Sequence, residues 1–294
     1  MIKHWEHTEI VDGATFERFK SFKAPVFPSA PLPNNTAVFI SCSGKRLEGI
    51  YDPELKSIRQ FRYLENPPPN RDLRLYLDAI SSPHITMIAI DGLMGTGKTS
   101  NAVESAVEFI NSTPCARGDL NCTKVVIAKP YVNAGGEEYG FLPGDADEKL
   151  DPTLTNFIQY FDRFSTIGFK KLRELGRVKV LPLGFIRGLD AENMIILADE
   201  CQNTRELISL ATRKAKNSRI FFLGDTSPFQ IDLQGVAPKK NGLTNIIDLL
   251  SGAPYFQYIE LKTLEHIVRS DEVRDIVKRL FEKYGENPQE WIIQ

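Results

Sequence analysis

A short glycine-rich segment constrains the fold of this chain more than any other feature. Residues 92–99 read GLMGTGKT and match the phosphate-binding pattern GxxxxGK[ST]. The run before it, residues 85–90 (ITMIAI), is apolar and rich in β-branched side chains, as a buried strand should be. Residues 100–110 then place small apolar side chains at helical spacing. The sequence therefore predicts a strand, a phosphate-binding loop and a helix in succession.

The residue types in this loop suit the binding of a nucleoside triphosphate. Glycines allow backbone N–H groups to point at phosphate oxygens, and the helix that follows favours negative charge at its N-terminus. We expect Lys98 to reach the β- and γ-phosphates and the Thr99 hydroxyl to bind Mg²⁺. A chance match is the alternative, and the strand–loop–helix context disfavours it. The predicted nucleotide contacts here are Gly92, Gly95, Thr96, Gly97, Lys98, Thr99 and Ser100.

A second chemical signal is an apolar strand that ends in two acids. Residues 194–200 read MIILADE. In NTPases with this arrangement the first carboxylate holds Mg²⁺ and the second polarises the attacking water, so we assign Asp199 to the metal and Glu200 to the base. A strand ending in solvated charge is a common alternative. The upstream phosphate loop favours chemistry, because the two strands can lie side by side. The pair indicates hydrolysis.

A third strand end adds a candidate sensor of the γ-phosphate. Residues 220–223 (IFFL) are followed by Gly224 and Asp225. At that strand tip, a polar group would lie between the phosphate loop and the acidic pair and could couple the phosphate to movement. A Gly-Asp turn is ordinary by itself, and only the order of the motifs gives it weight.

The chain is predicted to divide into two regions. Residues 1–70 contain three short strand-like runs (37–40, 49–51 and 58–63) between proline clusters, and we expect a small β-rich appendage with a linker that docks on the rest. From residue 71 to 294, strands alternate with helices such as 153–164 and 205–215, which predicts an α/β fold with a parallel sheet. Its expected strands are 85–90, 125–128, 178–181, 194–198, 219–223 and 255–261.

Composition excludes several classes of protein. The chain has 294 residues, of which 42% are apolar and 25% charged, and it has no apolar run that would span a bilayer and no signal-peptide pattern. We therefore expect a cytoplasmic protein with no membrane partner. The four cysteines lack metal or disulfide spacing and are predicted to be free thiols. His4 and His7 are expected to face solvent, not to bind metal.

The net charge of −2 gives no overall attraction to nucleic acid, so such binding would depend on local patches. Two runs of basic residues, at 170–179 and 213–219, are candidates for such a patch. Each could follow a phosphate backbone, but a solvated helix face is the commoner explanation. The first run holds Lys170, Lys171, Arg173, Arg177 and Lys179, and the second holds Arg213, Lys214, Lys216 and Arg219.

Taken together, several segments resemble the PhoH-like ATPase family over roughly residues 71–280. They are GTGKT at 95–99, GEE at 136–138, GFLPGD at 140–145, EK at 148–149, RG at 187–188, DECQNT at 199–204, GD at 224–225 and VR at 268–269. The resemblance implies a RecA-like P-loop NTPase related to superfamily 1 helicases, with Mg²⁺-dependent ATP hydrolysis linked in some members to RNA unwinding. Members fused to a PIN domain also degrade RNA; we expect no PIN domain and no nuclease activity here.

The resemblance also assigns roles to single residues. Arg269 matches the family's C-terminal arginine and is expected to act as an arginine finger across a subunit interface. Gln202, Gly224 and Asp225 are expected near the nucleotide. The sequence departs from the family at Leu73, where a glutamine is usual, and at Gln230, which stands further from Asp225 than usual. Expected nucleic-acid contacts are Gly140, Phe141, Lys149 and Arg187.

The expected function is an ATP-driven motor that is stimulated by single-stranded nucleic acid, with RNA favoured over DNA. A single RecA-like domain cannot grip a strand between two lobes, so we expect a homo-oligomer such as a ring. The alternative is a nucleotide-gated interaction protein with slow ATPase activity and no unwinding. A kinase is a weaker third option. The sequence leaves open the natural substrate, the polarity, the subunit number, the base selectivity and the role of residues 1–70.

Overall fold

Six parallel strands form the central sheet of the computed structural model, which describes residues 4–62, 67–111, 122–130, 154–205, 207–231 and 241–284. The sheet order is β10-β5-β9-β8-β6-β7. The strands are β5 (Met87–Gly92), β6 (Lys124–Lys129), β7 (Val178–Pro182), β8 (Met194–Ala198), β9 (Arg219–Gly224) and β10 (Phe256–Leu261). Each lies where an apolar run predicted it, so the predicted α/β fold with a RecA-like parallel sheet is confirmed.

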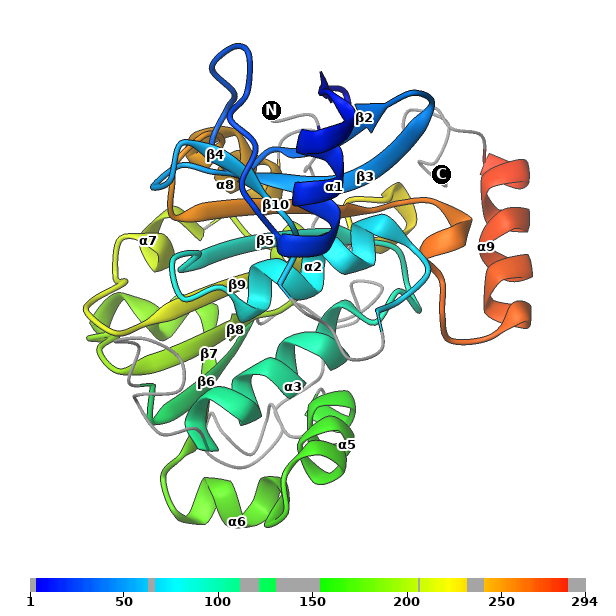
Figure 1. The fold of residues 1–294 in the computed structure, drawn as a ribbon. Helices are drawn as coiled ribbons and strands as arrows, with labels where there is room; N and C mark the ends of the chain where they lie inside the picture. The colour runs from blue at the N-terminus through cyan, green and yellow to red at the C-terminus, as the bar shows by residue number, and fades with distance from the viewer. Residues whose placement is uncertain are drawn as a thin grey trace.

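Helices cover both faces of this sheet (Figure 1). Side chains alternate along β5, so that Ile88 and Ile90 enter one core and Met87 and Ala89 the other. The first core is closed by α2 (Arg71–Ser81), α3 (Lys98–Asn111), α5 (Thr155–Phe164) and α6 (Gly168–Glu174). The second is closed by α7 (Leu207–Ala211) and α8 (Gly242–Leu250). The helix predicted over 205–215 is therefore too long. No helix in the described ranges is long and apolar enough to cross a membrane.

The order of the strands corrects one expectation. The strands that carry the phosphate loop and the acidic pair, β5 and β8, do not lie side by side, because β9 pairs with both. This order places the end of β9, with Gly224, between the two motifs. The predicted position of the Gly-Asp turn is thus confirmed, while the predicted contact between β5 and β8 is wrong.

The N-terminal region forms a separate four-stranded sheet, coloured blue in Figure 1. Its strands are β1 (Thr8–Ile10), β2 (Ala37–Cys42), β3 (Lys45–Asp52) and β4 (Ser57–Arg59). Phe16 and Phe19 of α1 (Gly13–Phe22) pack against Val38 and Ile40 of β2. The β-rich prediction is confirmed, but β1 and α1 were not predicted. The boundary between two domains at residues 70 and 71 stays a prediction.

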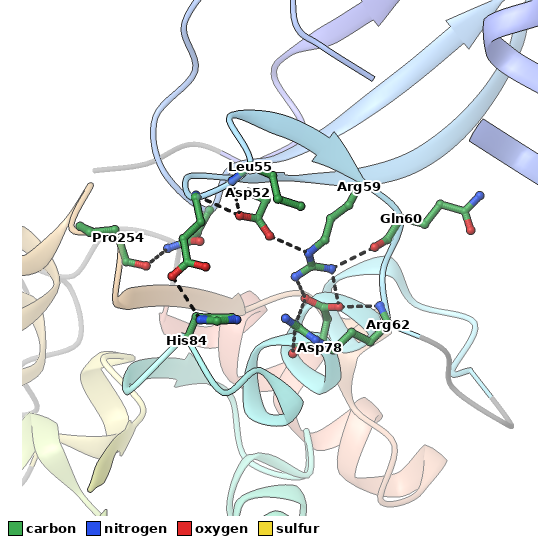
Figure 2. A network of polar contacts seen from close by, with 10 residues as sticks. Asp52, Leu55, Arg59, Gln60, Arg62, Asp78, His84 and Pro254 are labelled. Atoms are coloured by element: carbon green, nitrogen blue, oxygen red, sulfur yellow. Dashed lines mark hydrogen bonds and ion pairs between the residues drawn. The ribbon is translucent and has the colours of Figure 1, made fainter. Parts of the chain in front are cut away.

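The strand predicted over 58–63 ends early because the chain turns toward a buried carboxylate. Asp78 of α2 is 1% exposed and accepts hydrogen bonds from both terminal nitrogens of Arg59, at 3.0 and 2.8 Å. It also accepts one from the backbone N–H of Arg62, at 2.6 Å. Asp52 of β3 lies 3.4 Å from the Nε atom of Arg59 (Figure 2). This network docks the N-terminal sheet on α2, as expected for an appendage with a small core.

A second set of contacts joins the N-terminal region to β10. The Nε2 atom of His4 lies 2.9 Å from the carbonyl oxygen of Tyr258, and Nδ1 accepts a hydrogen bond from the N–H of Ala37. The Asn35 amide donates to the carbonyl oxygens of Pro254 and Phe256, both at 3.0 Å. Burial lowers the pKa of His4, which favours the neutral ring. The prediction that His4 faces solvent is wrong, because the His4 ring lies between β2 of the N-terminal sheet and β10 of the central sheet.

Two arginines of the basic runs have structural roles. Arg219 is fully buried, stacks 4.6 Å from the Phe109 ring, and donates to the carbonyl oxygens of Ile80 and Ile85 at 2.6 and 2.7 Å. Arg177 donates to the carbonyl oxygen of Ile110 in the last turn of α3. A cation at a helix C-terminus satisfies free carbonyls and opposes the helix dipole. Neither arginine is available to follow a phosphate backbone. Each basic run therefore offers fewer side chains for nucleic acid than its sequence suggests.

Three of the four cysteines, Cys42, Cys122 and Cys201, lie in the described part of the chain and are free thiols, as predicted. Burial raises the pKa of Cys122 to about 11 and that of Cys201 well above its ordinary value. A thiol must ionise to act as a nucleophile. We therefore assign no chemistry to either buried cysteine. Cys115 lies outside the described residues.

Candidate nucleotide site

The phosphate loop joins the end of β5 to the first residue of α3, which is Lys98. Gly95 and Gly97 adopt left-handed backbone angles, with φ of 79° and 80°. The buried hydroxyl of Thr96 donates to the carbonyl oxygen of Leu93 at 2.8 Å and closes the loop from inside. Lys98 curls back, and its Nζ donates to the Gly92 carbonyl oxygen at 3.0 Å. The predicted strand–loop–helix unit is confirmed.

Gly95 has a steric as well as a conformational reason to lack a side chain. A Cβ atom there would lie 3.2 Å from both Arg269 Cβ and Val273 Cγ1. A left-handed backbone costs a non-glycine residue about 1–2 kcal/mol. The loop therefore holds its shape only with glycine at this position.

We predict that Gly95→Ala lowers affinity for a fluorescent ATP analogue by about tenfold or more, because the loop must shift or accept strain of roughly 1–2 kcal/mol. Equilibrium fluorescence titration measures the change. The matched control is Gly176→Ala, where φ is 67° but a Cβ would meet nothing within 4 Å. Equal affinity loss in both variants would contradict a local effect on the loop.

The acidic pair follows β8 directly. Asp199 is 7% exposed, and its Oδ2 lies 3.3 Å from Nζ of Lys129 at the end of β6. Glu200 has a left-handed backbone (φ 54°) and accepts a hydrogen bond from Nε2 of Gln202 at 2.6 Å. Burial, and then the neighbouring charge of Asp199, raise the pKa of Glu200. A carboxylate with a raised pKa is a better proton acceptor, which suits the predicted general base.

Asp225 lies beyond the end of β9 with an unsatisfied carboxylate oxygen. Its Oδ1 accepts hydrogen bonds from the N–H and hydroxyl of Ser227, whereas Oδ2 is buried without a hydrogen-bond partner. Burial raises the pKa of Asp225, and the charge of Lys98 acts in the opposite direction. Buried polar atoms without a protein partner are uncommon, and Asp225 Oδ2 is one of them among the described residues.

Gln202 joins these two strand ends. Its Oε1 accepts from the N–H of Asp225 at 3.1 Å, and Nε2 donates both to Glu200 and to the carbonyl oxygen of Gln230. The whole amide is thus engaged by protein groups. Its predicted contact with the nucleotide stays a prediction, as do the contacts of Ser100 and Gly224.

The oxygen donors at this edge of the sheet fit Mg²⁺. Thr99 supplies a hydroxyl in the first turn of α3, and Asp199 and Glu200 supply carboxylates. Mg²⁺ prefers oxygen ligands and is commonly held by one or two carboxylates together with phosphate oxygens and water. Within the described residues, no group of three or more His, Cys, Asp or Glu side chains forms a separate metal site. The residues fit a metal that arrives with a nucleotide.

The C-terminal segment packs on the same loop. The N–H of Val268 donates to the carbonyl oxygen of Gly95 at 3.0 Å, and Ile267 is fully buried beside Leu93. The exposed Arg269 therefore stands next to the phosphate loop of its own chain, followed by α9 (Asp271–Tyr284). Its predicted action across a subunit interface stays a prediction.

Asp72 of α2 fixes the start of this segment. Its Oδ2 lies 3.1 Å from Nε2 of His266 in η7 (Leu264–His266), and its Oδ1 accepts from Trp5 Nε1 at 2.6 Å. Burial alone would raise the pKa of Asp72, but the hydrogen bonds from His266 and Trp5 outweigh it and leave the pKa below its ordinary value. The ionised carboxylate therefore stabilises the fold.

We predict that Asp72→Asn lowers the free energy of unfolding by about 1–3 kcal/mol at pH 7, the usual loss for a hydrogen bond to a charged group. Because the folded pKa is depressed, this stability exists above the unfolded pKa, near 4, and disappears as the pH falls through the folded pKa. Urea unfolding at stepped pH measures the difference between parent and variant. A difference that persists unchanged at the lowest pH would contradict a role for the charge.

Several predicted residues cannot be placed. Gly140, Phe141 and Lys149 lie outside the described residues, and of Arg187 only the backbone is described, in η4 (Leu183–Gly188). Leu73, which stands where the family tends to have glutamine, is buried in the first core. It offers no polar contact to a base.

Sequence reasoning missed residues that support the site. Tyr76 of α2 donates from its hydroxyl to the carbonyl oxygen of Lys98 at 2.6 Å. Lys129 faces Asp199, and Lys262 lies 2.6 Å from Asp91. Lys129 and Asp91 stand at or near the ends of predicted strands, which is a usable signal, because the carboxyl ends of parallel strands share one edge. Tyr76 carries no such signal.

A pocket of about 260 Å³ lies elsewhere, between the N-terminal sheet and the starts of β5 and β10. Arg59, Arg62, Ile85 and Tyr255 are among its lining residues. In open parallel sheets, ligands bind outside the carboxyl ends of the strands. The pocket is at the opposite ends, so we do not assign the nucleotide to it.

These features define a class: an α/β protein with a P-loop nucleotide site at the carboxyl edge of a RecA-like sheet. The model of the family described as PhoH-like protein matches residues 68–281. The chain belongs to this PhoH-like family.

Curated relatives agree with that assignment. The chain is 32% identical over 71% of its length to the PhoH-like protein of Mycobacterium tuberculosis, and 34% identical over 64% to that of Bacillus subtilis. It covers 56% of each relative, little more than half of their length. Protein PhoH2 of Thermobispora bispora is 27% identical over 65% of the chain, which covers 43% of that relative. A solved structure, the Legionella pneumophila ATPase DotB, aligns over 87% of the chain and 62% of its own length, with a TM-score of 0.29 and 15% identity.

Proposed function

We propose that this chain hydrolyses ATP in the presence of Mg²⁺. One observation carries the proposal: the phosphate loop and the half-buried Glu200, whose pKa is raised, lie at the same edge of one sheet. Glu200 is held at 2.6 Å by Gln202 and is thus oriented before any substrate binds. Family membership supports the same chemistry.

Each residue has a role in this proposal. The amides of the phosphate loop and Lys98 bind the phosphates, Thr99 and Asp199 hold Mg²⁺, and Glu200 accepts a proton from the attacking water. Mg²⁺ would neutralise charge on the phosphates when bound. Asp225 would respond to the presence of the γ-phosphate, and Arg269 would stabilise the transferring group.

We further propose that hydrolysis drives movement on single-stranded nucleic acid, with RNA favoured over DNA, in a cytoplasmic homo-oligomer such as a ring. Exposed basic residues remain for such a partner, among them Lys170 and Lys171 on α6 and Arg213 after α7. The resemblance of residues 140–145 to the family supports a nucleic-acid loop. The alternative remains a nucleotide-gated interaction protein with slow turnover.

We predict that single-stranded RNA raises ATP turnover by about fivefold or more, a coupling of roughly 1 kcal/mol. Steady-state phosphate release with and without RNA or single-stranded DNA measures it, and the stimulated rate should vanish in Glu200→Gln. Indifference to every nucleic acid would favour the interaction protein instead. Product analysis that finds a phosphorylated acceptor would favour a kinase.

Sedimentation in the presence of ATP and RNA tests the oligomer separately. We expect a species several times the 33.2 kDa mass of one chain. Only monomers under these conditions would exclude the ring and leave the hydrolysis proposal intact. The expected lack of nuclease activity is checked by incubating RNA with the protein and measuring its length.

A further inference from the structure

An ion pair between a buried carboxylate and a half-buried lysine lies beside the phosphate loop and belongs to none of the predicted motifs. Asp91, the residue before Gly92, has a side chain that is 3% exposed, and its Oδ2 lies 2.6 Å from Nζ of Lys262. Lys262 follows β10, which pairs with β5 so that Leu261 faces Gly92. The pair therefore joins the ends of two neighbouring strands at the edge that carries the phosphate loop.

Thr226 connects this pair to the Gly-Asp turn. Its N–H donates to Asp91 Oδ1 at 2.9 Å, and its hydroxyl donates to Asp91 Oδ2 at 2.7 Å. Lys262 also donates to the Thr226 hydroxyl oxygen. Thr226, the residue next to Asp225, thus makes three polar contacts with the side chains of Asp91 and Lys262.

Gln202 holds the turn from the other side. The Asp225 N–H donates to Gln202 Oε1 at 3.1 Å, and Gln202 Nε2 donates to Glu200 at 2.6 Å. Gly224 fits closely against Gln202, since a Cβ there would lie 2.7 Å from Oε1. A continuous set of contacts therefore leads from Lys262 to the carboxylate of Glu200.

Burial makes this arrangement sensitive to the loss of one member. A carboxylate as buried as Asp91 needs hydrogen bonds and a counter-charge, and removing Lys262 would leave its charge uncompensated. Without Lys262, the Asp91 carboxylate would keep its hydrogen bonds from Thr226 but lose its counter-charge, so the contacts of Thr226 would have to rearrange. The turn that carries Asp225 would then be displaced.

We propose that Asp91, Lys262 and Thr226 are positioning residues that hold Asp225 and, through Gln202, Glu200 in the arrangement needed for hydrolysis. The proposal rests on the proposed ATPase function for its kinetic consequence. Its structural part, the order of the turn, is independent of that function. The two parts are therefore tested by separate measurements.

Hydrogen exchange of backbone amides tests the structural part. In Lys262→Met we expect the Thr226 and Asp225 amides to exchange about tenfold faster or more, because local opening becomes easier, while amides of β5 keep their protection. The matched control is Arg59→Met, which removes a cation from another buried carboxylate, Asp78 of α2, and makes none of the contacts described for the turn. Unchanged exchange at Thr226 in Lys262→Met would overturn the proposal, whatever the activity.

Kinetics test the functional part. We expect Lys262→Met and Thr226→Val each to lower kcat for ATP about tenfold or more with KM within about threefold, the pattern of a lost transition-state interaction. Lys262→Arg should recover most of the rate, and Arg59→Met should leave kcat unchanged. A drop in melting temperature with kcat unchanged would show a merely structural pair and overturn the proposal, as would a rise in KM alone. If the parent chain hydrolyses no ATP, the proposed function fails, and the exchange result still decides the positioning.

Discussion

Replacing Glu200 with glutamine should lower kcat for ATP by about 10²- to 10⁴-fold, the usual loss when a positioned general base is removed. Glutamine keeps the size of the side chain and an oxygen that accepts the hydrogen bond from Gln202. It cannot take a proton from water. Nucleotide affinity should therefore stay close to that of the parent. Phosphate release and titration with a fluorescent ATP analogue measure the two quantities separately.

The matched control is Glu174→Gln on α6, where the side chain is 50% exposed and pairs with Lys171. We expect no change in kcat or affinity in this variant. A Glu200→Gln protein that hydrolyses ATP at the parent rate would contradict the assignment of the base. Equal loss of binding and turnover would instead indicate a damaged site.

The largest effect on stability should come from Asp78→Ala, which we expect to lower the free energy of unfolding by about 3–5 kcal/mol, as for other broken buried ion pairs. The change removes the carboxylate that accepts hydrogen bonds from both terminal nitrogens of Arg59, and it leaves the backbone N–H of Arg62 without this acceptor (Figure 2). Both arginines lie in the seam between the N-terminal sheet and α2. Equilibrium unfolding in urea measures the loss.

An exposed ion pair provides the comparison. Asp271 is 92% exposed and lies 2.7 Å from Arg274, so Asp271→Ala should cost less than about 1 kcal/mol. If Asp78→Ala costs no more than this control, the network in the seam contributes little to stability. The N-terminal sheet would then be held mainly by its contacts with β10.

The central sheet was predictable because its strands are buried on both faces. Such strands appear in the sequence as continuous apolar runs, as in residues 194–198, and each run begins or ends within a few residues of an observed strand. The phosphate loop and the acidic pair were predictable for a related reason. Their chemistry depends on neighbouring residues, so the whole signal lies in one short segment.

Features that depend on distant partners were not predictable. Nothing near Arg219 in the sequence indicates that it stacks on Phe109 and donates to the carbonyl oxygen of Ile80 at the end of α2. Its place in a run of basic residues suggested an exposed side chain instead. His4 likewise contacts Tyr258, which lies 254 residues further along the sequence. The pairing of Asp91 with Lys262 exists only because β10 lies beside β5, and strand order is not encoded in local periodicity.

The place of β10 also has a consequence for synthesis on the ribosome. β10, the last strand in the described part of the chain, pairs with β5, the first strand of the central sheet, and its Phe256 carbonyl oxygen accepts a hydrogen bond from Asn35 of the N-terminal region. Until residue 261 has emerged, one edge of β5 has no partner, and an unpaired strand edge invites association with other chains. A nascent chain therefore completes this flank of its phosphate loop late. Premature termination before β10 should yield an aggregating product that does not bind nucleotide.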